Sequence, residues 1–182
     1  FFSIYFGLPL YMREVWSWSP LKIGFALIPL NVVPLLTAAV AGKIVDRQGP
    51  RPMVIFGGIW SGVSFLIIGF FLMEAGYILF ALGLLVSGLG AMAIGNNTTI
   101  ATLLDIEDGL LASASSASYT ARRLGSALGA VLTASIVGNR LGSDFKDVYI
   151  WVWILGAGAY LLGSLITYLY YPRPNEQELS NV

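Results

Sequence analysis

The residues best placed to bind another molecule are polar side chains that interrupt long apolar runs. They are Asn31, Asn96, Asn97, Arg122 and Arg123. A polar group inside hydrocarbon is costly unless it has a partner, so such positions are typical of substrate or ion pathways. The runs contain no convergent nucleophiles or metal ligands at one depth. The pattern indicates binding of a solute without covalent chemistry, and we expect that the protein is not an enzyme.

Histidine and cysteine are both absent. Their absence excludes zinc sites built on those residues, Ser-His-Asp triads, disulfides and histidine-based pH switching. Any proton chemistry must therefore use carboxylates, yet the acids lie at the predicted ends of spans: Glu74, Asp105, Glu107 and Asp108. We expect no cofactor and no metal site. If the protein is driven by protons, we expect its coupling carboxylate outside this chain.

The asparagines each allow two interpretations. Asn31 lies between Pro29 and Pro34. It either faces the bundle and binds substrate or water, or it satisfies carbonyls that Pro34 frees. Asn96 and Asn97 are adjacent on a helix and cannot face the same way, so one of them is expected to line a cavity. Of the threonines that follow them, Thr98 or Thr99 is expected to bond back to its own helix.

Two adjacent arginines need a partner or an exit from the hydrocarbon. Counting back about 20 residues from Asn139 places the membrane edge near Thr120. On that count Arg122 and Arg123 extend toward the cytoplasmic interface. This geometry favours a structural role over substrate binding.

The elements that carry these residues are predicted to be membrane helices. The chain is 57% hydrophobic and 11% charged, whereas soluble domains carry about 25% charged residues. Ile23 to Gly42 and Pro52 to Met73 contain no charged residue, and a span needs roughly 20 apolar residues. The formal charge is zero, so nothing suggests a nucleic-acid partner. We therefore expect an all-α polytopic membrane bundle that contacts the lipid bilayer.

Short polar breaks divide the chain into one partial helix and five full spans. The predicted segments are 1–12, 21–45, 53–73, 78–104, 113–139 and 148–171. Their short connections predict antiparallel neighbours in a single domain over 1–182, with 172–182 as a short cytoplasmic tail. The first segment is too short to span, and we expect that it is a truncated helix. Small residues four apart predict close helix packing at Gly58 and Gly62, and at Gly125 and Gly129.

A charged ten-residue turn separates the second and third predicted helices. It runs from Gly42 to Arg51. Gly49 permits a turn with positive φ. Asp46 can pair with Arg47 or Arg51, or lie at a helix N-terminus. A generic positive-inside loop would also explain these charges.

The order of residues in this turn resembles a known family signature. Gly42-Lys43-Ile44-Val45-Asp46-Arg47-Gln48-Gly49-Pro50-Arg51 is similar to the Gly-x-x-x-Asp-Arg-x-Gly-Arg-Arg run between the second and third helices of each half of major facilitator superfamily transporters. Pro50 stands where the family often has a basic residue. Three further stretches resemble the fourteen-helix drug:proton antiporter branch: Leu8 to Pro29, Glu107 to Ser113, and Thr120 to Gly129.

The resemblance implies the C-terminal six-helix half of a transporter that alternately exposes a central cavity to each side. It implies a small-molecule, drug-like substrate, proton-coupled export, and an N-terminal half of the same polypeptide as partner. It implies that Gly42, Asp46, Arg47, Gly49 and Arg51 form a gating hairpin. Arg122 matches the family arginine, while Tyr119 and Arg123 stand where the family usually has Asn and often Gln.

The cavity-lining candidates are therefore Asn31, Asn96, Asn97, Tyr119 and Arg122. The expected location is the bacterial cytoplasmic membrane, with the C-terminus in the cytoplasm. Two alternatives stay open at this point. One is a sugar or metabolite symporter of the same superfamily, and the other is a membrane scaffold subunit without transport.

Overall fold

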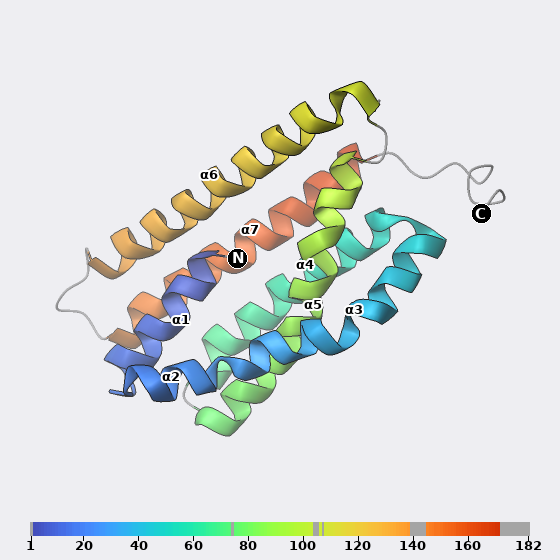
Figure 1. The fold of residues 1–182 in the computed structure, drawn as a ribbon. Helices are drawn as coiled ribbons and strands as arrows, with labels where there is room; N and C mark the ends of the chain where they lie inside the picture. Colours follow the sequence, from blue (N-terminus) through green and yellow to red (C-terminus); the bar gives the residue numbers. More distant parts are fainter. Residues whose placement is uncertain (1, 74, 104–105, 107, 139–144, 172–182) are drawn as a thin grey trace.

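The computed structural model describes residues 2–73, 75–103, 106, 108–138 and 145–171, and every regular element in those ranges is helical. The elements are α1 (Phe2–Glu14), α2 (Pro20–Ala26), α3 (Ile28–Gln48), α4 (Pro50–Ile67), the π-helical η1 (Ile68–Leu72), α5 (Tyr77–Leu103), the 3-10 turn η2 (Asp108–Leu110), α6 (Leu111–Gly138) and α7 (Phe145–Tyr170). The prediction of an all-helical membrane bundle is confirmed. Figure 1 shows the helices lying side by side.

Three segments of the described chain are long and apolar enough to cross a membrane, where the sequence analysis expected five. They are Pro20–Thr37, Pro50–Phe71 and Val148–Tyr170, and α5 contributes a shorter apolar stretch, Tyr77–Ala91. The 28-residue helix α6 is long enough but is not among them. Its first half is rich in serine and carries two arginines, so composition rather than length sets it apart.

The predicted second helix is divided in two. Ser19 caps α2, where its side chain accepts a hydrogen bond from the Lys22 amide, and the helix stops at Leu27. Pro29 then occupies the first turn of α3, where its missing N–H removes no helical hydrogen bond. The predicted single helix over 21–45 is therefore broken just before Pro29. The second proline, Pro34, lies inside α3.

The hairpin end of the bundle is the end that contains Gly49, and its turn is much tighter than expected. Residues 42–48 are still helical in α3, and α4 starts at Pro50. Only Gly49 separates the two helices, with φ 74° and ψ 172°. Lysine, arginine and glutamine are good helix formers, and proline is favoured at a first helical position, so the charged run continues the helix rather than forming a loop.

Helix α4 lies at the centre of the packing, against α5 on one side and α7 on the other. Glycines make both approaches possible. A Cβ on Gly58 would lie 1.7 Å from the Ser164 Oγ, and one on Gly62 would lie 2.8 Å from Leu161 of α7. On the α5 side, a Cβ on Gly57 would lie 2.7 Å from the Ala93 side chain. The helices contact each other backbone to backbone, as small residues allow in membranes.

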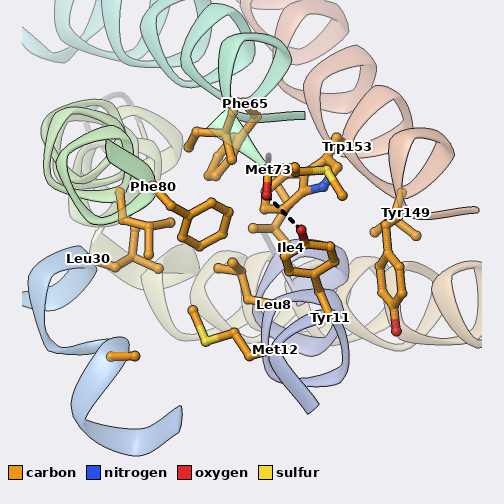
Figure 2. Packing of buried hydrophobic residues seen from close by; sticks show 14 of the residues in the cluster. Ile4, Leu8, Tyr11, Met12, Leu30, Phe65, Met73, Phe80, Tyr149 and Trp153 are labelled. Carbon is orange, nitrogen blue, oxygen red and sulfur yellow. Dashed lines mark hydrogen bonds between the residues drawn. The ribbon is translucent and has the colours of Figure 1, made fainter. Parts of the chain in front are cut away.

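The aromatic end of the bundle, opposite the hairpin end, holds a buried cluster of rings (Figure 2). Tyr11 of α1 stacks with Phe80 of α5 at 6.0 Å and meets Tyr149 of α7 edge-on at 5.3 Å. Its hydroxyl donates a 3.0 Å hydrogen bond to the Met73 carbonyl, just after η1. The π-helical turn lies against Trp153, which a Cβ on Gly69 would approach to 2.8 Å. This cluster joins α1, α5, α7 and the end of η1.

Helix α6 lies along one edge of the bundle, beside α1 and α7 (Figure 1). Its closest tie is to α1. Thr133 is fully buried and shares a hydrogen bond with the Ser3 hydroxyl, and a Cβ on Gly129 would lie 3.2 Å from the Ser3 amide nitrogen. Toward the hairpin end, most of α6 is exposed. This leaves open space between α6 and the rest of the bundle.

Candidate functional site

The first cavity lies between α5 and α6 and is lined mainly by hydroxyl groups. We call it the hydroxyl cavity. Its volume is about 510 Å³, and its lining residues are Thr99, Ser115, Ser116, Ser118, Tyr119, Thr120 and Arg122. Arg122 is the one cation among these residues, and none of them is an acid. The cavity is therefore a polar space whose fixed formal charge is positive.

The second cavity shares one lining residue, Arg122, with the first. We call it the apolar cavity. Its volume is about 500 Å³, and it is lined by Phe2, Ala91, Ile94, Thr98, Arg122, Gly125, Ser126 and Tyr160, which come from α1, α5, α6 and α7. Most of the wall is hydrocarbon or aromatic ring. Together the two cavities provide a polar and an apolar compartment that meet at one guanidinium group.

Arg122 is held by a hydroxyl and not by a carboxylate. Its Nη2 donates a hydrogen bond to the Thr99 Oγ1 of α5, and it forms no ion pair within the described part of the chain. Arg123 points elsewhere. It donates to the Tyr119 hydroxyl and lies over that ring, with Cζ 4.8 Å from the ring centroid. The two adjacent arginines therefore have different surroundings, and Arg122 is the one that lines the cavities.

Asn31 of α3 forms hydrogen bonds to α1 and to the break between α2 and α3. Its Oδ1 accepts a 2.6 Å hydrogen bond from the Tyr5 hydroxyl of α1. Its Nδ2 donates at 3.1 Å to the carbonyl of Leu27. The carbonyl that Pro34 frees is that of Leu30, and it faces Gly88, where a Cβ would lie 2.9 Å away. Asn31 thus satisfies a carbonyl at the break, and it lines neither of the two cavities.

Of the two adjacent asparagines on α5, the structure describes the side chain of Asn97. Asn97 is buried, and its Nδ2 donates at 2.8 Å to the Ala93 carbonyl of the same helix. The side chain of Asn96 lies outside what the structure describes. Thr98 also bonds back to its own helix, with its Oγ1 donating at 2.7 Å to the Ile94 carbonyl, as expected. Thr99 differs, because its hydroxyl accepts a hydrogen bond from Arg122.

The charged residues of the hairpin lie at the surface, with one exception. Asp46 and Arg47 are exposed, and within the described residues neither takes part in an ion pair, so a pair of Asp46 with Arg47 or Arg51, one of the two alternatives, is absent there. Arg51 is partly buried instead. Its Nη2 donates at 2.9 Å to the Tyr168 carbonyl in the last turn of α7. A cation at a helix C-terminus is electrostatically favourable, so Arg51 ties the start of α4 to the end of α7.

The glycines chosen from the sequence fall into two groups. Gly58, Gly62 and Gly129 lie where another helix approaches closely. Gly42 and Gly125 do not: a Cβ at either position would meet nothing within 4 Å. Gly125 instead lines the apolar cavity. Its lack of a side chain therefore leaves space in the cavity and brings no helix closer.

The sequence analysis did not assign Ser115, Ser118 or Tyr160 to a site. A pattern was available for the first two. Ser115, Ser118 and Arg122 are three, four and seven residues apart, which places them on one face of a helix. For Tyr160 no sequence signal was available, because its position depends on how α7 packs against α1 and α4.

The comparison with protein families gives a match over nearly the whole chain. The sequence profile of the Major Facilitator Superfamily matches residues 1–181. This chain belongs to the Major Facilitator Superfamily. Together with the apolar helices, the match identifies an integral membrane protein of a transporter superfamily.

Individual relatives in the superfamily support the same assignment. The chain is 24% identical over 142 residues to the "Tetracenomycin C resistance and export protein" of Streptomyces glaucescens, which covers 78% of this chain and 26% of that protein. It is 29% identical over 142 residues to "Citrate exporter 1" of Yarrowia lipolytica, covering 76% of this chain and 21% of that protein. A shorter match, 34% over 56 residues, joins it to a "Multidrug resistance protein B homolog" of Mycobacterium tuberculosis, covering 31% of this chain and 10% of that protein.

The chain therefore spans about a quarter of the length of the superfamily relative from Streptomyces glaucescens. No solved structure matches it significantly.

Proposed function

We propose that this chain is the C-terminal six-helix half of a proton-coupled exporter of small, drug-like organic molecules in the bacterial cytoplasmic membrane. Residues 1–182 are one domain, and residues 172–182 are a short cytoplasmic tail. The proposal includes the fourteen-helix drug:proton antiporter branch, which the sequence resemblance suggested. The named export activities of the Streptomyces and Yarrowia relatives support an exporter.

The observation that carries the proposal is the pair of cavities that meet at Arg122. A carrier needs a space of a few hundred Å³ lined by apolar groups and a small number of polar ones. The hydroxyl cavity and the apolar cavity, at about 510 and 500 Å³, fit this description. Both open along α6, where the bundle is least tightly packed. In the complete transporter, the N-terminal half would close this side.

The hairpin at Gly49 is proposed to act as a latch between the two halves. Asp46 and Arg47 are exposed and form no ion pair among the described residues, so we propose that they pair with charged groups of the other half. Arg51 is already engaged with α7 and would hold the hairpin in place. In one state of the cycle the latch would be closed, and in the other it would be released.

The coupling carboxylate is proposed to lie in the N-terminal half. None of the described residues that line the two cavities is an acid, and the acids Glu74, Asp105 and Glu107 lie outside the described residues. Neutralising Asp105 or Glu74 in the complete protein should therefore leave proton-coupled efflux within about twofold of the original. Loss of pH-driven efflux in Asp105→Asn or Glu74→Gln, at unchanged protein level, would contradict this placement.

The experiment that tests the function uses the complete protein in proteoliposomes. Movement of two fluorescent organic molecules, the cation ethidium and the amphiphilic acid 1-pyrenebutyrate, is followed by fluorescence while a pH gradient is imposed, with and without an uncoupler. The proposal expects movement that depends on the gradient and stops with the uncoupler. Movement that is independent of the gradient would exclude proton coupling, and no movement of any tested organic molecule would exclude the exporter.

A further inference from the structure

Within the described residues, no ion pair neutralises the positive charge that Arg122 brings to the hydroxyl cavity. Among the described residues, its lining contains one guanidinium, five hydroxyl-bearing serines and threonines, one tyrosine and no carboxylate. Arg122 donates to the neutral hydroxyl of Thr99 and forms no ion pair within the described ranges. A guanidinium has five N–H donors, so this single hydrogen bond leaves most of them available.

We propose that Arg122 and Ser115 form a subsite that binds the anionic group, a carboxylate, of the transported solute. The inference rests on the proposed function, because it names the class of molecule that the transporter would carry. Arg122 supplies the charge, and Ser115 supplies a second hydrogen-bond donor. The apolar cavity, which shares Arg122 in its lining, takes the hydrocarbon or aromatic body of the same molecule.

The geometry of α6 brings these two side chains to one place. Ser115 lies seven residues before Arg122, which is two helical turns and about 10 Å along the axis. Side chains on a helix lean toward its N-terminus, so the long arginine side chain extends toward Ser115. Both residues line the same cavity. A carboxylate between them can accept from both.

The other hydroxyls near this point are less suited to donate. Ser116 donates at 2.8 Å to the Ala112 carbonyl, and Thr120 donates at 2.8 Å to the Ser116 carbonyl. Their hydroxyl protons are therefore already used inside α6. Ser115 has no such hydrogen bond within the described residues, so its proton is available for a ligand. The Thr99 hydroxyl, as the acceptor for Arg122, sets the direction of the guanidinium.

The chemistry of this arrangement distinguishes solutes by charge. An arginine binds a carboxylate through two parallel N–H···O bonds, which are about twice as strong as neutral hydrogen bonds. A neutral amide gains no charge interaction, and a cationic group is repelled by Arg122. The expected ligand is an amphiphilic acid: a carboxylate attached to an apolar or aromatic body.

The test measures binding to the complete protein in nanodiscs of phosphatidylcholine by equilibrium dialysis. The probes are 2-naphthoate and its neutral counterpart 2-naphthamide. The original protein should bind the acid about tenfold more tightly than the amide, as expected for a charged hydrogen-bonded pair. Arg122→Ala should abolish this preference, Arg122→Lys should keep part of it, and Ser115→Ala should reduce it about threefold.

The matched control is Arg123→Ala, which removes the adjacent arginine that lines neither cavity and should keep the preference. An equal preference in Arg122→Ala and in the original protein would overturn the proposal, as would tighter binding of the amide. The same anion chemistry could come from a lipid headgroup. If nanodiscs containing phosphatidylglycerol abolish the preference of the original protein, the lipid occupies the subsite and the proposal is wrong.

The result is independent of whether the protein exports ethidium. Binding in nanodiscs needs no gradient, so an acid preference that depends on Arg122 would stand even if the efflux experiment failed. Conversely, proton-driven ethidium efflux without an acid preference would remove this subsite and leave the exporter intact.

Discussion

At the scale of single residues, two buried tyrosines of the aromatic end differ in one respect. The Tyr11 hydroxyl donates to the Met73 carbonyl, whereas the Tyr149 hydroxyl is buried with no hydrogen-bond partner within the described residues. Both rings belong to the same cluster. The pair therefore separates the contribution of a hydrogen bond from that of ring packing.

Removing the Tyr11 hydroxyl should destabilise the protein, and removing that of Tyr149 should not. Tyr11→Phe leaves the Met73 carbonyl without its partner at a cost of about 1–2 kcal/mol. Tyr149→Phe removes an unpaired polar atom from an apolar surrounding, so its effect should be neutral or stabilising. Thermal unfolding in detergent, followed by tryptophan fluorescence, measures both. Equal destabilisation by the two variants would contradict the assignment.

At the scale of elements, the contact of α4 with α7 depends on the absence of a side chain at Gly58. A methyl group there would overlap the Ser164 Oγ and press on the Tyr160 carbonyl at 3.0 Å. Gly158 of α7 is a suitable control, because a Cβ at that position would meet nothing within 4 Å.

Gly58→Ala should therefore force α4 and α7 apart, at a cost of about 1–3 kcal/mol. Gly158→Ala should be neutral, or stabilising by up to about 1 kcal/mol, because alanine is the better helix former. The unfolding midpoints of the two variants are compared under the same conditions. A Gly58→Ala midpoint equal to that of the original protein would show that the helices are not in close contact there.

The hairpin between α3 and α4 gives a third prediction. Gly49 has φ 74° and ψ 172°, a conformation that is almost restricted to glycine. Gly49→Ala should cost about 1–3 kcal/mol, whereas Gly42→Ala, in the helical part of the same run, should not lower the unfolding midpoint. If Gly42→Ala lowers that midpoint as much as Gly49→Ala does, backbone conformation is not the cause.

The prediction of elements from sequence succeeded where apolar length and simple end signals decide the structure. The ends of α5, α6 and α7 lie within three residues of the predicted ends. The break at Leu27 and the π-helical turn at Ile68–Leu72 were not predicted. The break at Leu27 arises because Pro29 starts a new helix, and the sequence was equally compatible with one kinked helix. The second depends on Trp153 packing against Gly69, which involves residues far apart in the sequence.

The candidate site was predictable only in part, for a similar reason. Arg122 was singled out because a charge in an apolar segment is conspicuous. Its partner Thr99 was not predicted, because the sequence does not tell which helix faces another. Asn31 was singled out as a polar residue between two prolines, but the Tyr5 hydroxyl and the Leu27 carbonyl as its partners became evident only in the fold.

At the scale of the whole molecule, the two ends of the bundle differ. On α5, Phe80 belongs to the aromatic cluster, and Thr99 lies 19 residues further on, about 28 Å along the helix. Rings join several helices at the aromatic end, while the cavities lie along α6 toward the hairpin end. Glu14 ends α1 at the aromatic end, and Gln48 ends α3 at the hairpin end.

These two positions should lie on opposite sides of the membrane. The chain contains no cysteine, so Glu14→Cys and Gln48→Cys each introduce a single thiol into this half. In intact cells, with any cysteines of the other half replaced, an impermeant maleimide should label Glu14→Cys, and it should label Gln48→Cys only after permeabilisation. Labelling of both thiols from the same side would contradict a membrane-spanning path from α2 through α3.

The amide of Asn31 holds the Tyr5 hydroxyl with one atom and the Leu27 carbonyl with another. A tilt of α1 would therefore pull directly on the point where the chain stops and restarts as α3. At this break the seven-residue helix α2 would change its direction relative to α3. The side-chain amide of Asn31 would thus couple the movement of α1 to the break between α2 and α3.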